Sequence, residues 1–427
     1  MRGLAMLGVL ACSAGLAQAE VQTNTAYVED LATDGTTLWV ATRGGVEGYA
    51  LQTQQRTKLY TSAAGLPESW ARSVKLVDGK LEVATSRARC TLVGERFACT
   101  PRFDFVAPAP HAAPSAHGRR VTASLEHAGR RFTGTAGDGV WIEGEGAHRM
   151  TPGEQICSNH VVAITEHRGV LYLGAFDEGI CRVTDGRYEL VTTPFRMVNR
   201  MLSTARGLVV AANEGLFVSR DGVEWKRVLS TPDGGWNGLA LDGKTLWATT
   251  PLTLYRFSVS AAGLRLRSSI ERPAGSTALQ GVAIARGEVW LASEDRGVIR
   301  AHGKKLTVLD RAAGMPSSWI IDVATMDGVV YAATLRDGLV RLEPSIAGAQ
   351  ISRVAGTASW LLHLTSDHST LFIGAQGGAM KLAAGETQAS RISTGALPHD
   401  NVYAVAQIRS ELYIATEGGL VTIAARQ

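Results

Sequence analysis

Short apolar segments recur along this chain at regular intervals, and each has the alternating pattern of a β-strand. Ten of them are pentapeptides that end in a small residue, such as LWVAT ending at Thr42, LYLGA at Ala175 and LFIGA at Ala375. The others end at Thr85, Thr135, Ala212, Thr250, Ser293, Thr334 and Thr416. Their last residues lie about forty positions apart, a period that indicates a repeat protein.

Each pentapeptide is predicted to be the second strand of a four-stranded unit. An apolar segment and a tight turn, such as Asp34-Gly35 or Asp327-Gly328, precede it, which is the pattern of a hairpin. A third alternating run and a weaker fourth strand then lead to the next copy. The runs lack helical periodicity, and a β-solenoid would use shorter coils. We therefore predict an all-β fold, a β-propeller of about ten four-stranded antiparallel blades.

The repeats follow one another without a linker, so we expect one closed ring in a single domain that spans residues 20–427. A smaller ring with extra blades is the alternative, because most propellers have four to eight blades. Only four residues follow Ile423, so residues 20–25 would lend the last blade its missing strand. Residues 100–120 are rich in proline and alanine and predict a flexible loop between two blades.

The first nineteen residues have the pattern of a secretory signal peptide. Arg2 precedes an apolar stretch, and Ala17-Gln18-Ala19 forms the expected cleavage site. We therefore expect a periplasmic or secreted protein that begins at Glu20, without a membrane span. The residues before Cys12 loosely fit a lipidation site, so a lipid anchor on Cys12 is the alternative.

The four cysteines that follow the leader are expected to form disulfides, because their number is even in an exported chain. A two-residue turn at Gly94-Glu95 would place Cys90 opposite Cys99 in a non-hydrogen-bonded pair, within disulfide reach. Cys157 with Cys181 then follows by elimination. Four buried free thiols are the alternative.

Charge and composition exclude several other kinds of site. The net charge is only +4 and is spread without runs, so we expect neither a nucleic-acid groove nor a membrane-binding surface. The ten histidines are scattered without ligand spacing, so no metal site is expected. No glycine-rich phosphate loop is found. We expect a monomer without a cofactor.

Three copies carry a further signature ahead of the inner strand: Gly65-Leu66-Pro67, Gly314-Met315-Pro316 and Ala396-Leu397-Pro398. Together with the strand that follows, they resemble the two-component regulator propeller repeat over residues 26–425. The resemblance implies an extracytoplasmic sensing propeller that detects carbohydrates or related ligands. The chain stops at Gln427 without a kinase, so we expect no direct signalling by this polypeptide.

Ligand binding is expected where the starts of the inner strands meet, at the mouth of the central channel. Ring-bearing side chains recur there: Tyr27, Trp70, His160, Trp236, Trp319 and Trp360. Such rings stack on sugars or clamp an apolar peptide. The alternative is that the tryptophans pack between blades as core. One residue before each inner-strand anchor, the chain places polar candidates for the channel wall: Asp30, Ser73, Arg200, Asp322 and His363.

These residues predict an exported, non-enzymatic propeller that binds a small molecule, a glycan or a partner protein at this face, with Arg200 and His363 in the binding set. One alternative is a lyase or glycosidase that uses Asp30, Asp322 and His363, since an acid and a base in one cavity support proton transfer. A solvated channel wall explains the same residues equally well. A structural interaction scaffold is the second alternative. The segment 219–225 resembles an Asp-box, which is a structural turn and no sign of hydrolysis.

Overall fold

The computed structural model describes residues 19–101, 120–150, 155–260, 263–346, 348–367 and 369–424. The predicted signal peptide with Cys12, and most of the proline-rich insert, lie outside these residues. The described part contains strands and two short 3-10 turns, η1 (Ser62–Ala64) and η2 (Arg311–Ala313), but no α-helix. Accordingly, no helix in this part is long and apolar enough to cross a membrane.

The strands form ten four-stranded antiparallel sheets, which confirms the predicted all-β architecture and the number of blades. We number the blades in chain order. Blade 1 consists of β2 (Val28–Thr33), β3 (Thr37–Thr42), β4 (Gly45–Ala50) and β5 (Arg56–Tyr60). Blade 2 consists of β6 (Ser73–Val77), β7 (Lys80–Ala84), β8 (Ala88–Val93) and β9 (Arg96–Pro101). Blade 3 consists of β10 (Val121–His127), β11 (Arg130–Thr135), β12 (Val140–Glu143) and β13 (His148–Arg149).

Blades 4 to 7 repeat the same order of strands. Blade 4 consists of β14 (Val161–His167), β15 (Val170–Ala175), β16 (Gly179–Thr184) and β17 (Arg187–Val191). Blade 5 consists of β18 (Val198–Thr204), β19 (Gly207–Ala212), β20 (Gly215–Ser219) and β21 (Lys226–Leu229). Blade 6 consists of β22 (Gly238–Asp242), β23 (Thr245–Thr249), β24 (Thr253–Ser260) and β25 (Gly263–Glu271). Blade 7 consists of β26 (Leu279–Ala285), β27 (Glu288–Ser293), β28 (Val298–His302) and β29 (Lys305–Leu309).

The last blade takes its fourth strand from the start of the chain. Blade 8 consists of β30 (Ile320–Met326), β31 (Val329–Thr334), β32 (Leu339–Ser345) and β33 (Gly348–Arg353). Blade 9 consists of β34 (Leu361–Ser366), β35 (Thr370–Ala375), β36 (Gly378–Ala383) and β37 (Ser390–Arg391). Blade 10 consists of β38 (Val402–Ile408), β39 (Glu411–Thr416), β40 (Gly419–Ala424) and β1 (Glu20–Gln22).

The pentapeptides are the second strands of the blades, and their apolar character follows from burial on both faces. In β19 every residue is buried, because neighbouring blades cover both sides of the sheet. Such a strand has no solvated face and therefore lacks polar alternation. The outermost strands, such as β5, face solvent on one side and keep exposed polar residues.

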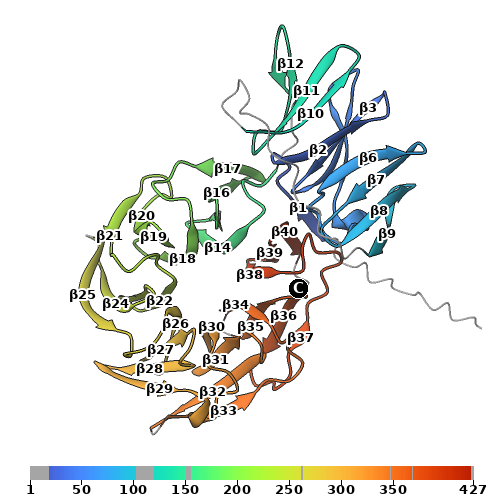
Figure 1. Ribbon diagram of the computed structural model, residues 1–427. Helices are drawn as coiled ribbons and strands as arrows, with labels where there is room; N and C mark the ends of the chain where they lie inside the picture. Colours follow the sequence, from blue (N-terminus) through green and yellow to red (C-terminus); the bar gives the residue numbers. More distant parts are fainter. Residues whose placement is uncertain are drawn as a thin grey trace, which may run out of the picture.

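The blades form two groups, which differs from the predicted single ring of ten. The inner strands of blades 4 to 10 pack side by side in order, and β14 returns to β38, so seven blades close a ring. Blades 1 to 3 form a separate group in which β2 lies between β6 and β10. Figure 1 shows the two groups side by side. The contacts therefore show the alternative arrangement, a smaller ring with extra blades.

Strand β1 supplies the fourth strand of blade 10, as the short last repeat predicts. Glu20 pairs with Thr422 and Gln22 with Leu420, so the first strand of the chain completes the last blade. The chain then leaves the ring, builds blades 1 to 3 and comes back as β14. Blades 1 to 3 stay outside because the ring is already closed by the contact between β14 of blade 4 and β38 of blade 10.

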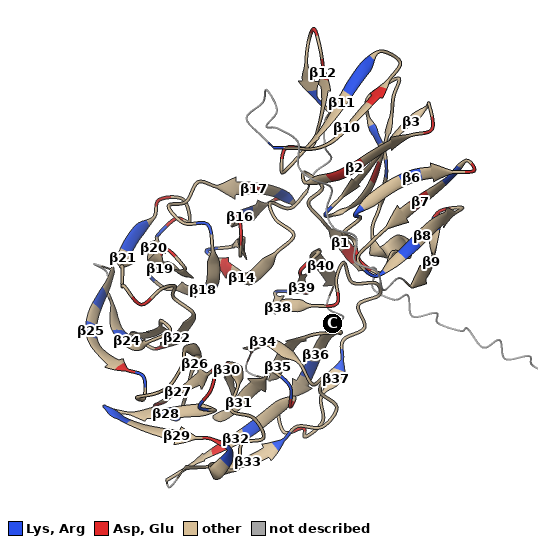
Figure 2. Cartoon of the chain, viewed as in Figure 1, with Lys and Arg blue, Asp and Glu red and all other residues tan. Residues whose placement is uncertain are grey.

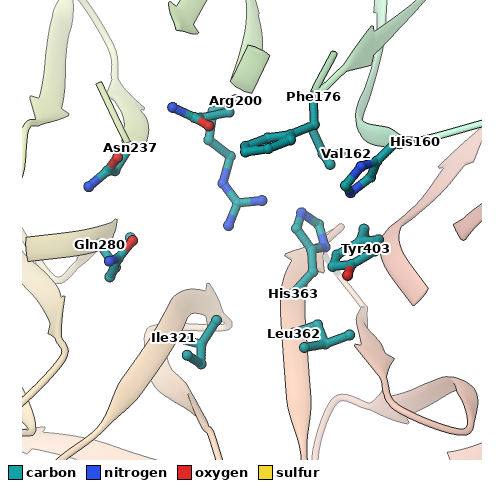
Figure 3. Close-up of a pocket in the computed structure, with 12 residues that line it drawn as sticks. His160, Val162, Phe176, Arg200, Asn237, Gln280, Ile321, Leu362, His363 and Tyr403 are labelled. Carbon is teal, nitrogen blue, oxygen red and sulfur yellow. The ribbon is translucent and has the colours of Figure 1, made fainter. Parts of the chain in front are cut away.

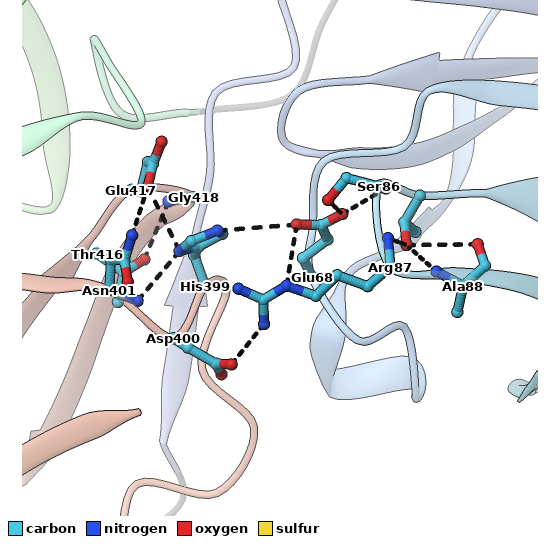
Figure 4. Close-up of polar contacts among 11 residues, drawn as sticks. Glu68, Ser86, Arg87, Ala88, His399, Asp400, Asn401, Thr416, Glu417 and Gly418 are labelled. Atoms are coloured by element: carbon cyan, nitrogen blue, oxygen red, sulfur yellow. Dashed lines mark hydrogen bonds and ion pairs between the residues drawn. The ribbon is translucent and has the colours of Figure 1, made fainter. Parts of the chain in front are cut away.

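A polar network joins the two groups (Figure 4). Buried Glu68 accepts a hydrogen bond from the backbone N–H of Ser86 at 2.6 Å, and its other oxygen lies 3.7 Å from Nε2 of His399 in the ring. Arg87 forms an ion pair with Asp400 across the same interface. The two groups are therefore held together by charged and hydrogen-bonded side chains.

Two of the Leu-Pro signature loops meet at this interface. The backbone N–H of Ser69 donates to the carbonyl oxygen of Pro398 at 2.8 Å. Leu66, Pro67 and Leu397 line a cavity of about 300 Å³ between the groups. Elsewhere on the molecule, charged residues of both signs are spread over both groups (Figure 2), in keeping with the small net charge.

Both predicted disulfides are confirmed. Cys90–Cys99 joins β8 to β9 with a Cα–Cα distance of 4.0 Å, and these residues are direct partners in the hairpin. Cys157–Cys181 joins the segment before β14 to β16, with a Cα–Cα distance of 5.6 Å. Disulfide bonds are typical of extracytoplasmic proteins.

Removing Cys157–Cys181 by the double substitution C157S/C181S is expected to lower the free energy of unfolding by about 3 kcal/mol, because the bond closes a loop of 24 residues in sequence. The shorter Cys90–Cys99 loop predicts a slightly smaller loss for C90S/C99S. Urea denaturation of both variants measures the difference. A C157S/C181S protein as stable as the parent would contradict a structural role for this bond.

Candidate functional site at the channel mouth

A cavity of about 470 Å³ opens at one end of the channel through the seven-bladed ring. Each ring blade contributes one residue from the start of its inner strand, and we call these the mouth residues. They are Val162, Asn199, Asn237, Gln280, Ile321, Leu362 and Tyr403. Figure 3 labels all of them except Asn199 around a common opening, together with His160 and Phe176.

A β-bulge places most of the mouth residues. In every ring blade except blade 6, the register between the first two strands shifts near the start of the inner strand. In β18, Val198 pairs with Ala212 and Arg200 pairs with Ala211, so Asn199 has no partner residue in the ladder. A bulge of this kind re-aims a side chain, and here Asn199 and Arg200 both line the cavity.

Blades 5 to 7 form a polar half of the mouth. The carboxamide nitrogens of Asn199 and Asn237 each donate to a backbone carbonyl of the next blade or the loop before it, at 2.8 Å. The nitrogen of Gln280 donates to Oε1 of Glu294 at 2.6 Å. Within the described chain, the three carboxamide oxygens accept no hydrogen bond and are not buried. The polar half therefore presents hydrogen-bond acceptors to a ligand.

The opposite half of the mouth is apolar and aromatic. Its mouth residues are Val162, Ile321, Leu362 and Tyr403. The His160 ring packs between Phe176 and Tyr403, with ring centroids 5.2 and 5.0 Å away. Burial lowers the pKa of His160 and raises the pKa of Tyr403, so both groups are neutral at pH 7. This half suits the flat face of a ring.

Two exposed tryptophans extend the apolar half over the outer surface. Trp319 and Trp360 are 46% and 39% exposed and stand two residues before Ile321 and Leu362 in the chain. The guanidinium of Arg336 lies 5.5 Å from the Trp360 ring. Both predicted tryptophans are thus accessible, although they lie outside the lining of the cavity itself.

An ion pair crosses the channel below the mouth. Arg200 of blade 5 donates to Oδ2 of Asp322 of blade 8. The backbone N–H groups of Val323 and Leu364 donate to the same carboxylate, each at 2.9 Å. Asp322 is 2% exposed and both its oxygens are occupied, so it acts as a fixed anchor for Arg200.

His363 lies beside this pair with no hydrogen-bond partner in the described part of the chain. It is 8% exposed, and its Nδ1 atom is buried and unpaired. Burial, and then the charge of Arg200, lower the pKa of His363 well below its ordinary value, so the imidazole is neutral. His363 and Arg200 line both the mouth cavity and a second cavity of about 230 Å³ deeper in the channel. We call Arg200, Asp322 and His363 the channel floor.

Three of the predicted binding residues therefore come together, namely His160, Arg200 and His363. Trp236 does not join them, because it is 1% exposed and packs 4.9 Å from the Tyr255 ring in the core between blades 5 and 6. The structure therefore confirms the alternative prediction for Trp236, which is that it packs in the core between blades.

The remaining candidates lie in the three-bladed group, away from the channel. Tyr27 and Trp70 flank the guanidinium of Arg43, with ring centroids 3.5 and 4.7 Å away. Asp30 accepts a hydrogen bond from the backbone N–H of Val74 at 3.0 Å in the same group. The predicted catalytic trio of Asp30, Asp322 and His363 is thus not assembled, because blade 1 is outside the ring.

The sequence interpretation missed all seven mouth residues. The sequence interpretation placed only one residue of each inner strand on the channel wall. In a regular strand the preceding residue would point away from the channel, because side chains alternate between the two faces. The bulge breaks this alternation. An alignment of the repeats on Arg200 and His363 would have revealed the mouth residues, which stand one position before these two residues in the aligned repeats.

The described residues contain no group of three or more His, Cys, Asp or Glu side chains that could hold a metal ion. What the site offers chemically is a set of acceptors on one side, an apolar wall on the other, and a cation with a neutral imidazole beneath. This arrangement can bind an amphipathic ring or move a proton at His363.

The sequence matches no protein-family model and no curated protein. Solved structures are similar in fold. PorZ, a surface component of the type-IX secretion system of Porphyromonas gingivalis, is 15% identical with a TM-score of 0.55, over 93% of this chain and 68% of that one. The extracellular domain of BT4673 from B. thetaiotaomicron, a candidate hybrid two-component system, is 11% identical with a TM-score of 0.51, over 94% and 70%.

A third similar structure is virginiamycin B lyase from Staphylococcus aureus, studied as an inactive histidine-to-alanine variant with quinupristin. It is 11% identical with a TM-score of 0.53, and the match covers 63% of this chain and 95% of that one. At such identities these likenesses show the propeller fold alone. They include both the extracellular domain of a candidate two-component system and an enzyme.

Proposed function

We propose that this protein is an exported, non-enzymatic β-propeller that binds a ligand at the mouth of its seven-bladed ring, as a sensor-type extracytoplasmic domain. The observation that carries the proposal is the two-sided mouth, with acceptor oxygens on blades 5 to 7 and an apolar wall on blades 8, 9, 10 and 4. The extracellular domain of BT4673, which has a similar fold, supports the sensor class.

The two-sided mouth favours a carbohydrate-like ligand or a peptide side chain. The C–H face of a sugar packs on apolar side chains such as Leu362 and Tyr403, while its hydroxyls donate to the carboxamide oxygens opposite. Exposed Trp319 and Trp360 offer further stacking surface beside the cavity for a longer glycan or for a partner protein.

Export through the first nineteen residues is part of the proposal. Strand β1 begins at Glu20, so cleavage after Ala19 would leave this strand complete at the mature N-terminus. The disulfides support an oxidising compartment. N-terminal sequencing of the protein from periplasm and medium tests this, and a mature chain that starts at another residue or carries a lipid on Cys12 contradicts it.

Replacing Leu362 and Tyr403 by alanine is expected to weaken ligand binding at least about tenfold, because the apolar wall of the mouth is lost. A glycan array and peptide pull-down with the purified protein provide the ligand, and calorimetry measures its affinity. The control is L266A, which removes an exposed leucine on the outer strand β25. Unchanged affinity in the folded L362A/Y403A protein would contradict binding at the mouth.

A lyase is the second candidate function, since a neutral, unpartnered imidazole in a channel can act as a general base. The similar fold of virginiamycin B lyase, in which a histidine-to-alanine variant is inactive, supports testing it. Incubation of the captured ligand with the parent protein and with H363A distinguishes the two functions. Product formed by the parent and lost in H363A would favour the lyase over a binding protein.

A further inference from the structure

The ion pair of the channel floor offers the cavity hydrogen-bond donors only. An arginine guanidinium has five N–H donors, and Asp322 takes one of those of Arg200. The remaining nitrogens of Arg200 are not among the buried unpaired atoms of the described chain, so they reach the cavity. The Asp322 oxygens are already occupied by Arg200 and two backbone N–H groups. A ligand group that reaches Arg200 must therefore be an acceptor.

His363 can provide a second donor to the same group. Its Nδ1 atom has no partner and is buried in the channel, and its Nε2 atom makes no hydrogen bond to the described protein yet is not buried. Arg200 and His363 both line the mouth cavity, and Figure 3 shows their polar ends approaching the same space. An acceptor with two oxygens, that is a carboxylate, fits between them better than a single hydroxyl.

We propose that the ligand of the mouth is a hydroxylated cyclic carboxylic acid of the uronic acid type, whose carboxylate reaches Arg200 and His363. The ring lies on the apolar half near Leu362, and its hydroxyls donate to the carboxamide oxygens of Asn199, Asn237 and Gln280. This assignment of a ligand class rests on the proposed function of the mouth.

The charge balance of the floor couples this binding to a proton. Without ligand, Arg200 and Asp322 cancel and His363 is neutral. A ligand carboxylate adds one negative charge, which a protonated His363 neutralises. The groups that face His363 from the surrounding strands are Arg200 on β18, Asp322 on β30 and Tyr403 on β38, and Tyr403 stays neutral because burial raises its pKa.

The sign of the pH dependence follows from these charges. The carboxylate raises the pKa of His363 from its lowered value in the free protein. Affinity for the acid therefore rises as the pH falls through the pKa of the complex, and it levels off below the pKa of the free protein. A neutral sugar takes up no proton and shows no such dependence.

The test is calorimetry with D-glucuronate and D-galacturonate against D-glucose and D-galactose, at about pH 8 and about pH 5.5, in two buffers of different ionisation enthalpy. We expect the acids to bind at least about tenfold more tightly than their neutral partners, the magnitude of one charge-assisted hydrogen bond. Their affinity should increase at the lower pH with uptake of a proton.

Two variants assign the effect to the floor. H363Q is expected to abolish the proton uptake, and R200K is expected to reduce the preference for the acid over its neutral partner. The matched control H302Q alters a histidine on the outer part of blade 7. Equal binding of acids and neutral sugars would overturn the ligand class and leave the mouth as a binding site. If none of the four sugars binds, the ligand class is wrong, whereas the L362A/Y403A experiment with the captured ligand decides the proposed function separately.

Discussion

Replacing Gly419 by valine is expected to lower the free energy of unfolding by about 4 kcal/mol. Gly419 begins β40 with a φ of 138°, a conformation that L side chains rarely adopt. A Cβ atom there would lie 2.5 Å from the carbonyl oxygen of Gln22 and 2.9 Å from Cγ2 of Thr23. The substitution therefore strains the backbone and also pushes β1 away from β40, its partner strand in blade 10.

Chemical denaturation followed by tryptophan fluorescence measures this loss. The matched control is G94V, because Gly94 also has a positive φ, of 63°, but a Cβ atom there meets nothing within 4 Å. G94V should lose only the cost of backbone strain, about 1–2 kcal/mol. If G419V and G94V are equally stable, the contact between β1 and β40 does not stabilise blade 10.

Replacing Asp322 by alanine is expected to cost about 3–5 kcal/mol of folding free energy, because it leaves the charge of Arg200 without its partner in the channel. The backbone N–H groups of Val323 and Leu364, which donate hydrogen bonds to Asp322, lose their acceptor as well. Arg200 belongs to blade 5 and Asp322 to blade 8, so the substitution removes an interaction that joins two blades across the channel.

Thermal and chemical denaturation of D322A test this expectation. The control is E126A, which breaks the ion pair of Glu126 with Arg131, where both side chains are more than half exposed. Such a pair contributes less than about 1 kcal/mol. A D322A protein that loses no more than E126A would show that the channel ion pair is not structural, and Asp322 would then be open to a different role.

The sequence predicts the blades well because the contacts that define a blade are local. The pentapeptides that end at Ala175 and Thr416 pair with the segments directly before and after them, as β15 and β39 do. The Cys90–Cys99 bond is predictable for the same reason, since a two-residue turn sets the register of its hairpin. The short-range periodicity of the sequence is therefore sufficient to predict the strands of a blade and their order.

Part of the site could also be predicted from the sequence. The polar residue one position before the inner-strand anchor does face the channel at Arg200, Asp322 and His363. The acceptors of Asn199 and Gln280 were not foreseen, because a bulge adds one residue without any change in the apolar pattern. Whether a tryptophan at the strand start is core or surface, as for Trp236 and Trp319, depends on the neighbouring blade.

By itself, then, the sequence determined the repeat, the strands, the blade count and the cysteine pairs. Only the tertiary structure decided that seven blades close the ring and three do not. The repeats are alike, so any number of them could pack in order, and the ring has seven blades because β14 of blade 4 packs on β38 of blade 10. This packing leaves Asp30 outside the channel and places Arg200, Asp322 and His363 together in it, because the number of blades in a closed ring decides which blades lie across it.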